Sequence, residues 1–153
     1  MKTIDDYRKK IDEIDDTILR LLNERASCVI EIGKIKQSQN KPLYVPSREK
    51  AIYERLKALN TGPFPDSSLK IVFREIISAS LSLEEVQKIA YLGPQGTFTN
   101  LAGVKHFGLS AKLIPSGSIP EVFEDVEKKR CDYGIIPIEN SLEGVVNHTL
   151  DMF

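Results

Sequence analysis

The sequence predicts an all-helical domain followed by the beginning of an α/β lobe with a parallel sheet. In the first part, apolar residues recur every seven positions without a proline from Ile4 to Ile35, which is typical of a long amphipathic helix. Glycine is rare there, since only two glycines precede residue 90 and all the others follow it. After residue 88, short apolar runs alternate with amphipathic segments, as in β-α-β units. We therefore expect a helical domain at 1–88 and an incomplete α/β lobe at 89–153.

The first helix is expected to run from about Ile4 to about Ile35 and to end before Pro42. At ~1.5 Å per residue, residues 3–38 would span about 54 Å, which is longer than a compact domain of about 90 residues can cover. We therefore expect a second copy of the chain to cover the excess apolar surface.

Two shorter helices should follow. One begins after Pro46, with Ser47 as its N-cap, and stops at the next Gly-Pro pair. The other has Asp66 or Ser67 as its N-cap and extends to about Lys88. Three helices, one of them overlong, would make up the first domain.

The second part should alternate strands with crossover helices, which favours a parallel sheet. The expected order is strand 88–92, turn 93–96, helix 97–107, strand 111–114, helix 119–130, strand 133–136 and a last helix from 142 to the end.

The composition indicates a globular protein with a small ligand. The 153 residues are 41% hydrophobic and 28% charged, and the formal net charge is −1. Like charges form no long block, so there is no sign of a nucleic-acid interface. Apolar runs are shorter than the ~18 residues of a membrane span, and the first residues lack the apolar stretch of a signal peptide, so we expect a cytoplasmic protein without membrane contact. Cys28 and Cys131 are expected to be small buried side chains in the reduced state.

Arg25 occupies a position of the heptad stripe where an apolar residue belongs. A guanidinium keeps its charge, so its burial requires an anionic partner, either a structural carboxylate or an anionic ligand. Alternatively, a polar residue at such a position sets the helix register or the oligomeric state. Lys36 lies eleven residues later, about 20° around the helix, and so shares this face. Arg8 is about 100° away from Arg25, so it could enter the same pocket only from a partner's helix.

Polar side chains also occur at the core-facing edges of the two shorter helices. Arg48 and Glu49 flank the apolar stripe at the first turn of the second helix. Ser80 falls on the apolar face of the third helix, with Glu84 as its i+4 neighbour. Cations, a hydroxyl and carboxyls without a nucleophile suit a small dianionic carboxylate, on which chemistry would proceed by holding a conformation and stabilising charge.

These residues form motifs that closely resemble the all-helical class of chorismate mutase. The matching positions are Arg8 with Ile11 and Asp15, the runs Leu22–Arg25 and Glu31–Lys36, and Ser47-Arg48-Glu49. The runs Tyr91–Thr99 and Ile136–Gly144 are similar to the start of a prephenate dehydratase domain. Together the two parts resemble the bifunctional enzyme of phenylalanine biosynthesis, cut short after residue 153.

The resemblance implies an intertwined homodimer whose two sites each mix residues from both chains, and a cofactor-free rearrangement of chorismate to prephenate. It implies that Arg25 and the partner subunit's Arg8 clamp the substrate carboxylates. It further implies that Lys36 and Glu84 act on the ether oxygen as the catalytic pair. Glu49 is expected to bind the ring hydroxyl, while Ser80 and Arg48 support a carboxylate and the shape of the site. No metal is expected, because nothing groups His106 and His148 as ligands.

Two positions depart from the family pattern. Val45 stands where some members have an acid, so a hydrogen bond to the hydroxyl is missing or comes from the backbone. Glu84 stands where some have Gln, and an ionised carboxylate would repel the charge that grows on the ether oxygen. We therefore expect Glu84 to act in its protonated form, with turnover falling as pH rises.

Two alternatives to an active mutase stay open. The helical dimer could be a non-catalytic module that binds chorismate or prephenate or that only dimerises a larger protein. Residues 90–153 could also be half of a two-lobed small-molecule binding protein. We expect neither dehydratase activity nor phenylalanine feedback from these 153 residues, because the family's catalytic threonine motif and regulatory domain lie beyond them.

Overall fold

The structure is a computed structural model, and it describes residues 3–140 and 144–145. The chain forms two compact units, Met1–Val45 and Pro46–Phe153. Within the described residues, no helix has both the length and the apolar character that crossing a bilayer requires.

The first unit consists of helix α1, Ile4–Ser38, and the segment that follows it. Its start is fixed by a capping box: the amide of Asp6 donates to Thr3 Oγ1 at 3.2 Å, and the amide of Thr3 donates to Asp6 Oδ2 at 2.7 Å. At the other end, Asn40 adopts a left-handed conformation with φ 51°. The predicted long helix is thus confirmed.

The apolar stripe of α1 is exposed in the single chain. The large apolar residues at its heptad positions are all between 48% and 72% exposed: Ile4, Tyr7, Ile11, Ile14, Ile18, Leu21, Ile32 and Ile35. Cys28 shares this stripe and is exposed as well, so the expectation that it is buried was wrong for the single chain. The reason is that the large apolar residues on either side of it along the stripe are exposed as well.

Helices α2, Pro46–Leu59, and α3, Asp66–Ser82, open the second unit and pack against each other. Pro46 is itself the first helical residue, so Ser47 is inside α2 and not its N-cap. A proline suits this position because its missing N–H would have no partner there.

The ends of α3 also differ from the expectation. Pro65 is the N-cap, without a side-chain hydrogen bond, and Asp66 Oδ1 instead accepts from Asn60 Nδ2 at 2.6 Å. The helix ends at Ser82 and not near Lys88, because the chain must become extended to enter the sheet at Lys88.

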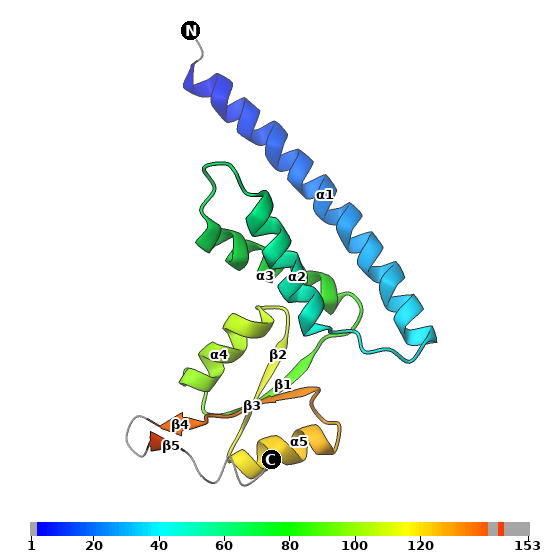
Figure 1. Cartoon of the computed structure of the whole chain (residues 1–153), viewed down its shortest axis with the longest axis vertical. Helices are drawn as coiled ribbons and strands as arrows, with labels where there is room; N and C mark the ends of the chain where they lie inside the picture. The colour runs from blue at the N-terminus through cyan, green and yellow to red at the C-terminus, as the bar shows by residue number, and fades with distance from the viewer. Residues whose placement is uncertain (1–2, 141–143, 146–153) are drawn as a thin grey trace. The chain divides into compact units, whose positions relative to one another are not determined.

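The α/β lobe is built on the parallel strands β1, Lys88–Leu92, β2, Lys112–Ser116, and β3, Tyr133–Ile135, in the order β2-β1-β3. Ala90 of the central strand is in register with Ile114 on one side and Gly134 on the other. Helices α4, Phe98–Phe107, and α5, Ile119–Glu127, connect the strands and cover opposite faces of the sheet (Figure 1). The predicted parallel sheet with crossover helices is confirmed.

Glycines at two points let these helices approach the sheet closely. A Cβ on Gly103 of α4 would lie 2.9 Å from Leu113 Cδ2 on one face. A Cβ on Gly134 of β3 would lie 2.8 Å from Val122 Cγ1 of α5 on the other. Val122 packs there with Ala90 and Cys131 in the buried core, so the expectation that Cys131 is buried is confirmed.

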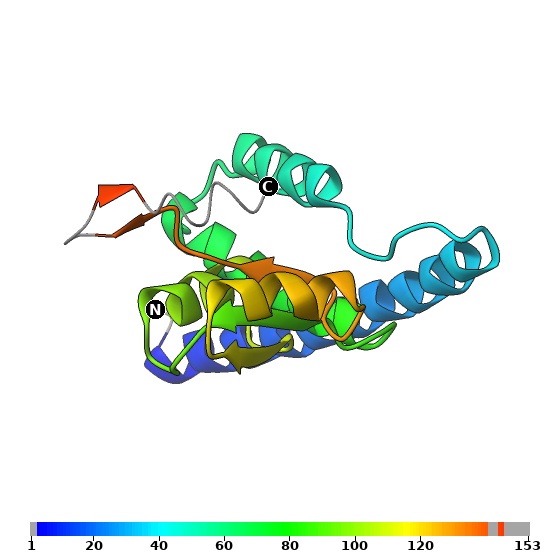
Figure 2. The same cartoon turned by 90° about the horizontal axis from the view of Figure 1, so that it is seen from below.

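A short antiparallel ribbon follows the sheet. Strand β4, Glu139–Asn140, pairs with β5, Gly144–Val145. Figure 2 shows this ribbon (orange-red) apart from the three-stranded sheet. The predicted last helix is therefore wrong at 144–145, and the rest of its range lies outside the described residues.

Helix α3 is docked on the C-terminal end of α4 within the second unit. The amide of Leu109 donates to Glu75 Oε2 at 3.1 Å, and the amide of Ser110 donates to Ser78 Oγ at 3.2 Å. Gly108, at φ 77°, lets the chain pass Ser78, since a Cβ there would lie 2.5 Å from Ser78 Cβ. These polar contacts join α3 to the α/β lobe within the second unit.

Candidate active site

The seven residues predicted for the site fall into both compact units. Arg8, Arg25 and Lys36 are on α1 in the first unit. In the second unit, Arg48 and Glu49 are on α2, Ser80 is on α3, and Glu84 follows the end of α3.

The three cations of α1 differ in exposure. Arg8 is mostly exposed and pairs with Asp5 on the same helix at 3.3 Å. Arg25 is half-buried near the middle of the helix. Lys36 is also half-buried, and its Nζ donates to the backbone oxygen of Leu43 at 2.5 Å. An ammonium has three donors, so this contact leaves Lys36 able to donate to an anionic ligand as well.

Glu49 is a buried carboxylate between α2 and α3, with 9% of the residue exposed. Arg74 Nη1 lies 2.8 Å from Glu49 Oε1, at an angle outside hydrogen-bond geometry. The Tyr53 hydroxyl donates to the same oxygen at 3.1 Å. The Arg74 guanidinium also lies over the Tyr53 ring, 5.5 Å from its centroid. Glu49 is therefore held in place by two neighbours that the sequence analysis did not identify.

A signal for Arg74 was present in the sequence. Ile77 and Leu81 follow it at i+3 and i+7, so Arg74 is a charged residue on an apolar helix face, as Arg25 is on α1. The pattern that singled out Arg25 applies to Arg74 too. Its partner, Glu49, is on a different helix and follows only from the packing.

Ser80 is buried on α3, as predicted, but its hydroxyl donates to the carbonyl of Ile76 at 2.7 Å. To support a substrate carboxylate, this hydroxyl would have to rotate away from the helix carbonyl. Glu84 lies beyond the last residue of α3, in a turn where its amide donates to Leu81 at 3.0 Å. Its Oε2 is buried. Arg48 is exposed at the first turn of α2.

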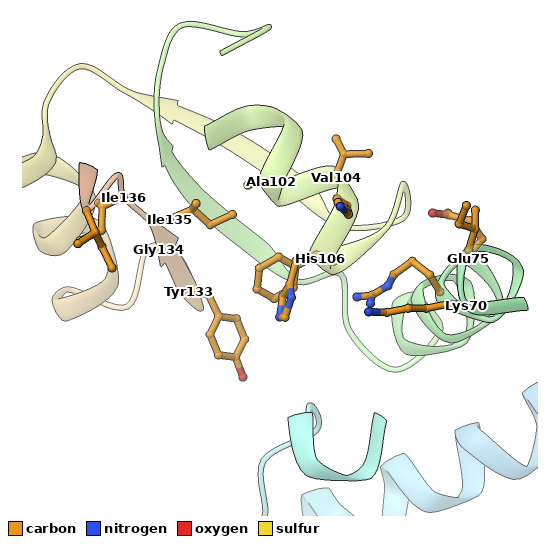
Figure 3. A pocket seen from close by; sticks show the side chains of 14 residues that line it. Lys70, Glu75, Ala102, Val104, His106, Tyr133, Gly134, Ile135 and Ile136 are labelled. Carbon is orange, nitrogen blue, oxygen red and sulfur yellow. The ribbon is translucent and has the colours of Figure 1, made fainter. Parts of the chain in front are cut away.

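A separate cavity of about 820 Å³ lies between α3 and the lobe, and it contains none of the seven predicted residues. Lys70, Arg74 and Glu75 line it from α3, while Lys105, His106 and Phe107 line it from α4. Figure 3 shows Lys70 reaching toward His106, with Tyr133 of β3 nearby. Burial raises the pKa of Tyr133 above its ordinary value, with a smaller contribution from the charge of Asp132. His106 is exposed at the end of α4, as expected, and His148 lies outside the described residues.

The turn at 93–96 makes the tight connection that its glycines predicted. Gly96 has φ 87°, and its amide donates to Asn100 Oδ1 at 3.1 Å. Thr97 caps α4, and Thr99 Oγ1 donates back to the carbonyl of Leu92 at 2.5 Å. Among the described residues, no three His, Cys, Asp or Glu side chains are grouped to hold a metal ion.

Known proteins match both parts of the chain. Residues 7–85 match the family Chorismate mutase type II, and residues 89–153 match Prephenate dehydratase. A bifunctional chorismate mutase/prephenate dehydratase from Aquifex aeolicus is 52% identical over all of the chain, which covers 43% of that protein. The Neisseria gonorrhoeae protein of the same name is 46% identical over 99% of the chain and 42% of its own length. The chain therefore spans less than half the length of these relatives.

A solved structure agrees with the first match. Chorismate mutase from Thermus thermophilus superimposes with a TM-score of 0.54 at 44% identity, covering 55% of this chain and 96% of that one. The first match spans more than half of the chain and includes all seven predicted site residues. The chain thus belongs to the chorismate mutase type II family and carries, after that domain, part of a prephenate dehydratase domain.

Proposed function

We propose that this chain is a chorismate mutase that converts chorismate to prephenate without a cofactor. The observation that carries the proposal is the family match at 7–85, which includes the charged residues on apolar faces, Arg25 and Lys36 of α1 among them. Residues 1–88 form the proposed mutase domain, and 89–153 belong to the dehydratase-like lobe.

The reaction is an intramolecular rearrangement, so the site needs no nucleophile. It must select the reactive conformer and stabilise the negative charge that grows on the ether oxygen. In the proposal Arg25 and the partner subunit's Arg8 hold the two carboxylates, and Lys36 donates to the ether oxygen. Donors already in place at that oxygen stabilise the transition state more than the ground state.

A homodimer is part of the proposal, because α1 alone leaves its apolar stripe in water. The stripe residues are 48% to 72% exposed, and fully burying one such isoleucine is worth ~1.5–3 kcal/mol. A second copy of α1 would cover the stripe. It would also bring Arg8 of one subunit to the Arg25 of the other.

Glu49 suits the proposed contact to the ring hydroxyl. The ion pair with Arg74 and the hydrogen bond from Tyr53 both use Oε1, which leaves Oε2 to accept from a substrate hydroxyl. Glu84 would donate to the ether oxygen only in its protonated form. Ser80 and Arg48 complete the set on the second unit's side.

The test is the disappearance of chorismate, followed optically, with the wild type beside Arg25→Ala and Arg20→Ala. Arg20 is a matched control, since it is on the same helix and forms an exposed ion pair with Glu24 at 3.6 Å. We expect turnover in the wild type and in Arg20→Ala, and loss of most turnover in Arg25→Ala. A folded dimeric wild type without turnover would refute the proposal and favour a non-catalytic binding or dimerisation module.

We expect no conversion of prephenate to phenylpyruvate by residues 1–153, because only part of a dehydratase domain is matched. Formation of phenylpyruvate by the purified chain would contradict this expectation. The longer relatives carry both activities in their names, so the two activities require separate assays.

A further inference from the structure

The cavity between α3 and the α/β lobe combines cationic and apolar walls. Its volume is about 820 Å³, within the range of ~300–1,000 Å³ typical of small-molecule sites. Both walls belong to the second unit and are joined by the contacts of Glu75 and Ser78 to the segment after α4. Hydrogen bonds therefore hold the two walls of the cavity in position relative to each other.

Positive charge predominates on its lining. Lys70 and Lys105 line it from opposite helices, and within the described part of the chain neither forms an ion pair. Arg74 also lines the cavity, but its charge is paired with Glu49, since Nη1 lies 2.8 Å from Glu49 Oε1. The acidic group on the lining, Glu75, has Oε2 engaged by the amide of Leu109. Such an excess of donors favours an anionic ligand group.

The remaining walls are apolar and partly aromatic. Phe107 and Tyr133 form a tilted pair with ring centroids 5.5 Å apart, and Ile135 lines the cavity beside them. A ring packed against this pair gains aromatic contact in addition to burial. In the view of Figure 3, His106 lies between Tyr133 and the tip of Lys70. A ligand with a ring and an acidic group could thus contact both kinds of wall.

From this arrangement we infer that the cavity binds a small carboxylate with a cyclic apolar body. The carboxylate lies between Lys70 and Lys105, and the ring lies against Phe107 and Tyr133. None of the seven residues assigned to the mutase reaction lines the cavity, although Arg74 on its wall is paired with Glu49 of that set. The inference does not rest on mutase activity.

The test is calorimetric titration of the 153-residue chain with 3-phenylpropionate as the probe. The comparison ligands are 3-phenylpropanamide, which lacks the charge, propionate, which lacks the ring, and inorganic phosphate. Lys70→Met and Lys105→Met each remove one cation. Ala102→Trp fills the cavity from an exposed position of α4, and Lys112→Met is a matched control on an exposed strand position outside the cavity. Circular dichroism verifies that each variant is folded.

We expect saturable binding of 3-phenylpropionate at one site, weakened about tenfold in each lysine variant and lost in Ala102→Trp. Lys112→Met and Arg25→Ala should bind as the wild type does, and the amide and propionate should bind more weakly. No saturable binding, retained binding in Ala102→Trp, or equal affinity for phosphate would each overturn the inference. Loss of binding in Arg25→Ala would also overturn it, because it would assign the ligand to the mutase site.

Discussion

Arg74 Nη1 lies 2.8 Å from Oε1 of Glu49, and the two side chains are only 11% and 10% exposed. Each charge is therefore taken out of water by contact with the other, across the boundary between α2 and α3. Replacing one residue of such a pair lowers the free energy of unfolding more than replacing both does, because the remaining charge stays buried without an opposite charge beside it.

Arg74→Met should lower the free energy of unfolding by ~3 kcal/mol, since it leaves the Glu49 carboxylate buried and unpaired. The double variant Glu49→Met/Arg74→Met should lose less than Arg74→Met alone. Urea unfolding measures both. Arg55→Met is the matched control on an exposed position of α2 and should be neutral. Equal losses in Arg74→Met and Arg55→Met would show that the ion pair does not stabilise the helical segment.

Gly108→Ala should loosen the docking of α3 on the lobe. The left-handed φ of 77° disfavours alanine, and the new Cβ would lie 2.5 Å from Ser78 Cβ. We expect a loss of ~2 kcal/mol or more in thermal or urea unfolding. Gly62→Ala is the control, because a Cβ there has nothing within 4 Å. A Gly108→Ala variant as stable as Gly62→Ala would mean that this docking contributes little.

Mixing two inactive variants tests whether the mutase site is shared between subunits. Arg8→Ala and Arg25→Ala should each be nearly inactive alone. Random exchange should yield heterodimers in which one of the two sites has both arginines, restoring about a quarter of the wild-type turnover. Absence of any recovery, with subunit exchange verified by mass spectrometry, would place both arginines of a site on one chain. High turnover by either variant alone would show that its arginine is not needed.

The pH profile tests the role of Glu84. Mutase turnover should fall with rising pH as this carboxyl ionises, because a carboxylate repels the charge that develops on the ether oxygen. Glu84→Gln should retain activity at alkaline pH, since an amide donates at any pH. Identical profiles for the wild type and Glu84→Gln would remove Glu84 from the reaction.

Thiol alkylation distinguishes the two cysteines. Burial raises the pKa of the Cys131 thiol above its ordinary value, so near pH 8 it is less ionised than an exposed thiol and also less accessible. Cys28 should react with iodoacetamide first, and Cys131 only after unfolding. If a second α1 covers the stripe, the rate at Cys28 should fall as protein concentration rises. A concentration-independent rate at Cys28 would argue against an interface along this stripe.

The sequence by itself determined the elements whose causes are local. The heptad pattern without proline predicts α1, and the capping residues Thr3 and Asp6 fit its start. The alternation beyond residue 88 predicts three parallel strands and two crossover helices, and the chain has them in that order. Arg25 was identifiable as a candidate site residue because it is a charged residue at a position where the repeat of its own helix calls for an apolar one.

Only the tertiary structure decided the features that join residues far apart in the chain. Sequence periodicity marks Arg74 as unusual, but its pairing with Glu49 depends on how α2 packs on α3. Helix α3 ends at Ser82 because β1 must begin at Lys88, and residues 144–145 pair as β5 with β4 where the local pattern favoured a helix. The cavity at Lys70 and Lys105 exists because Ser78 and Gly108 bring two helices together. Local propensity acts within a few residues, whereas these contacts depend on packing free energy between segments that are distant in sequence.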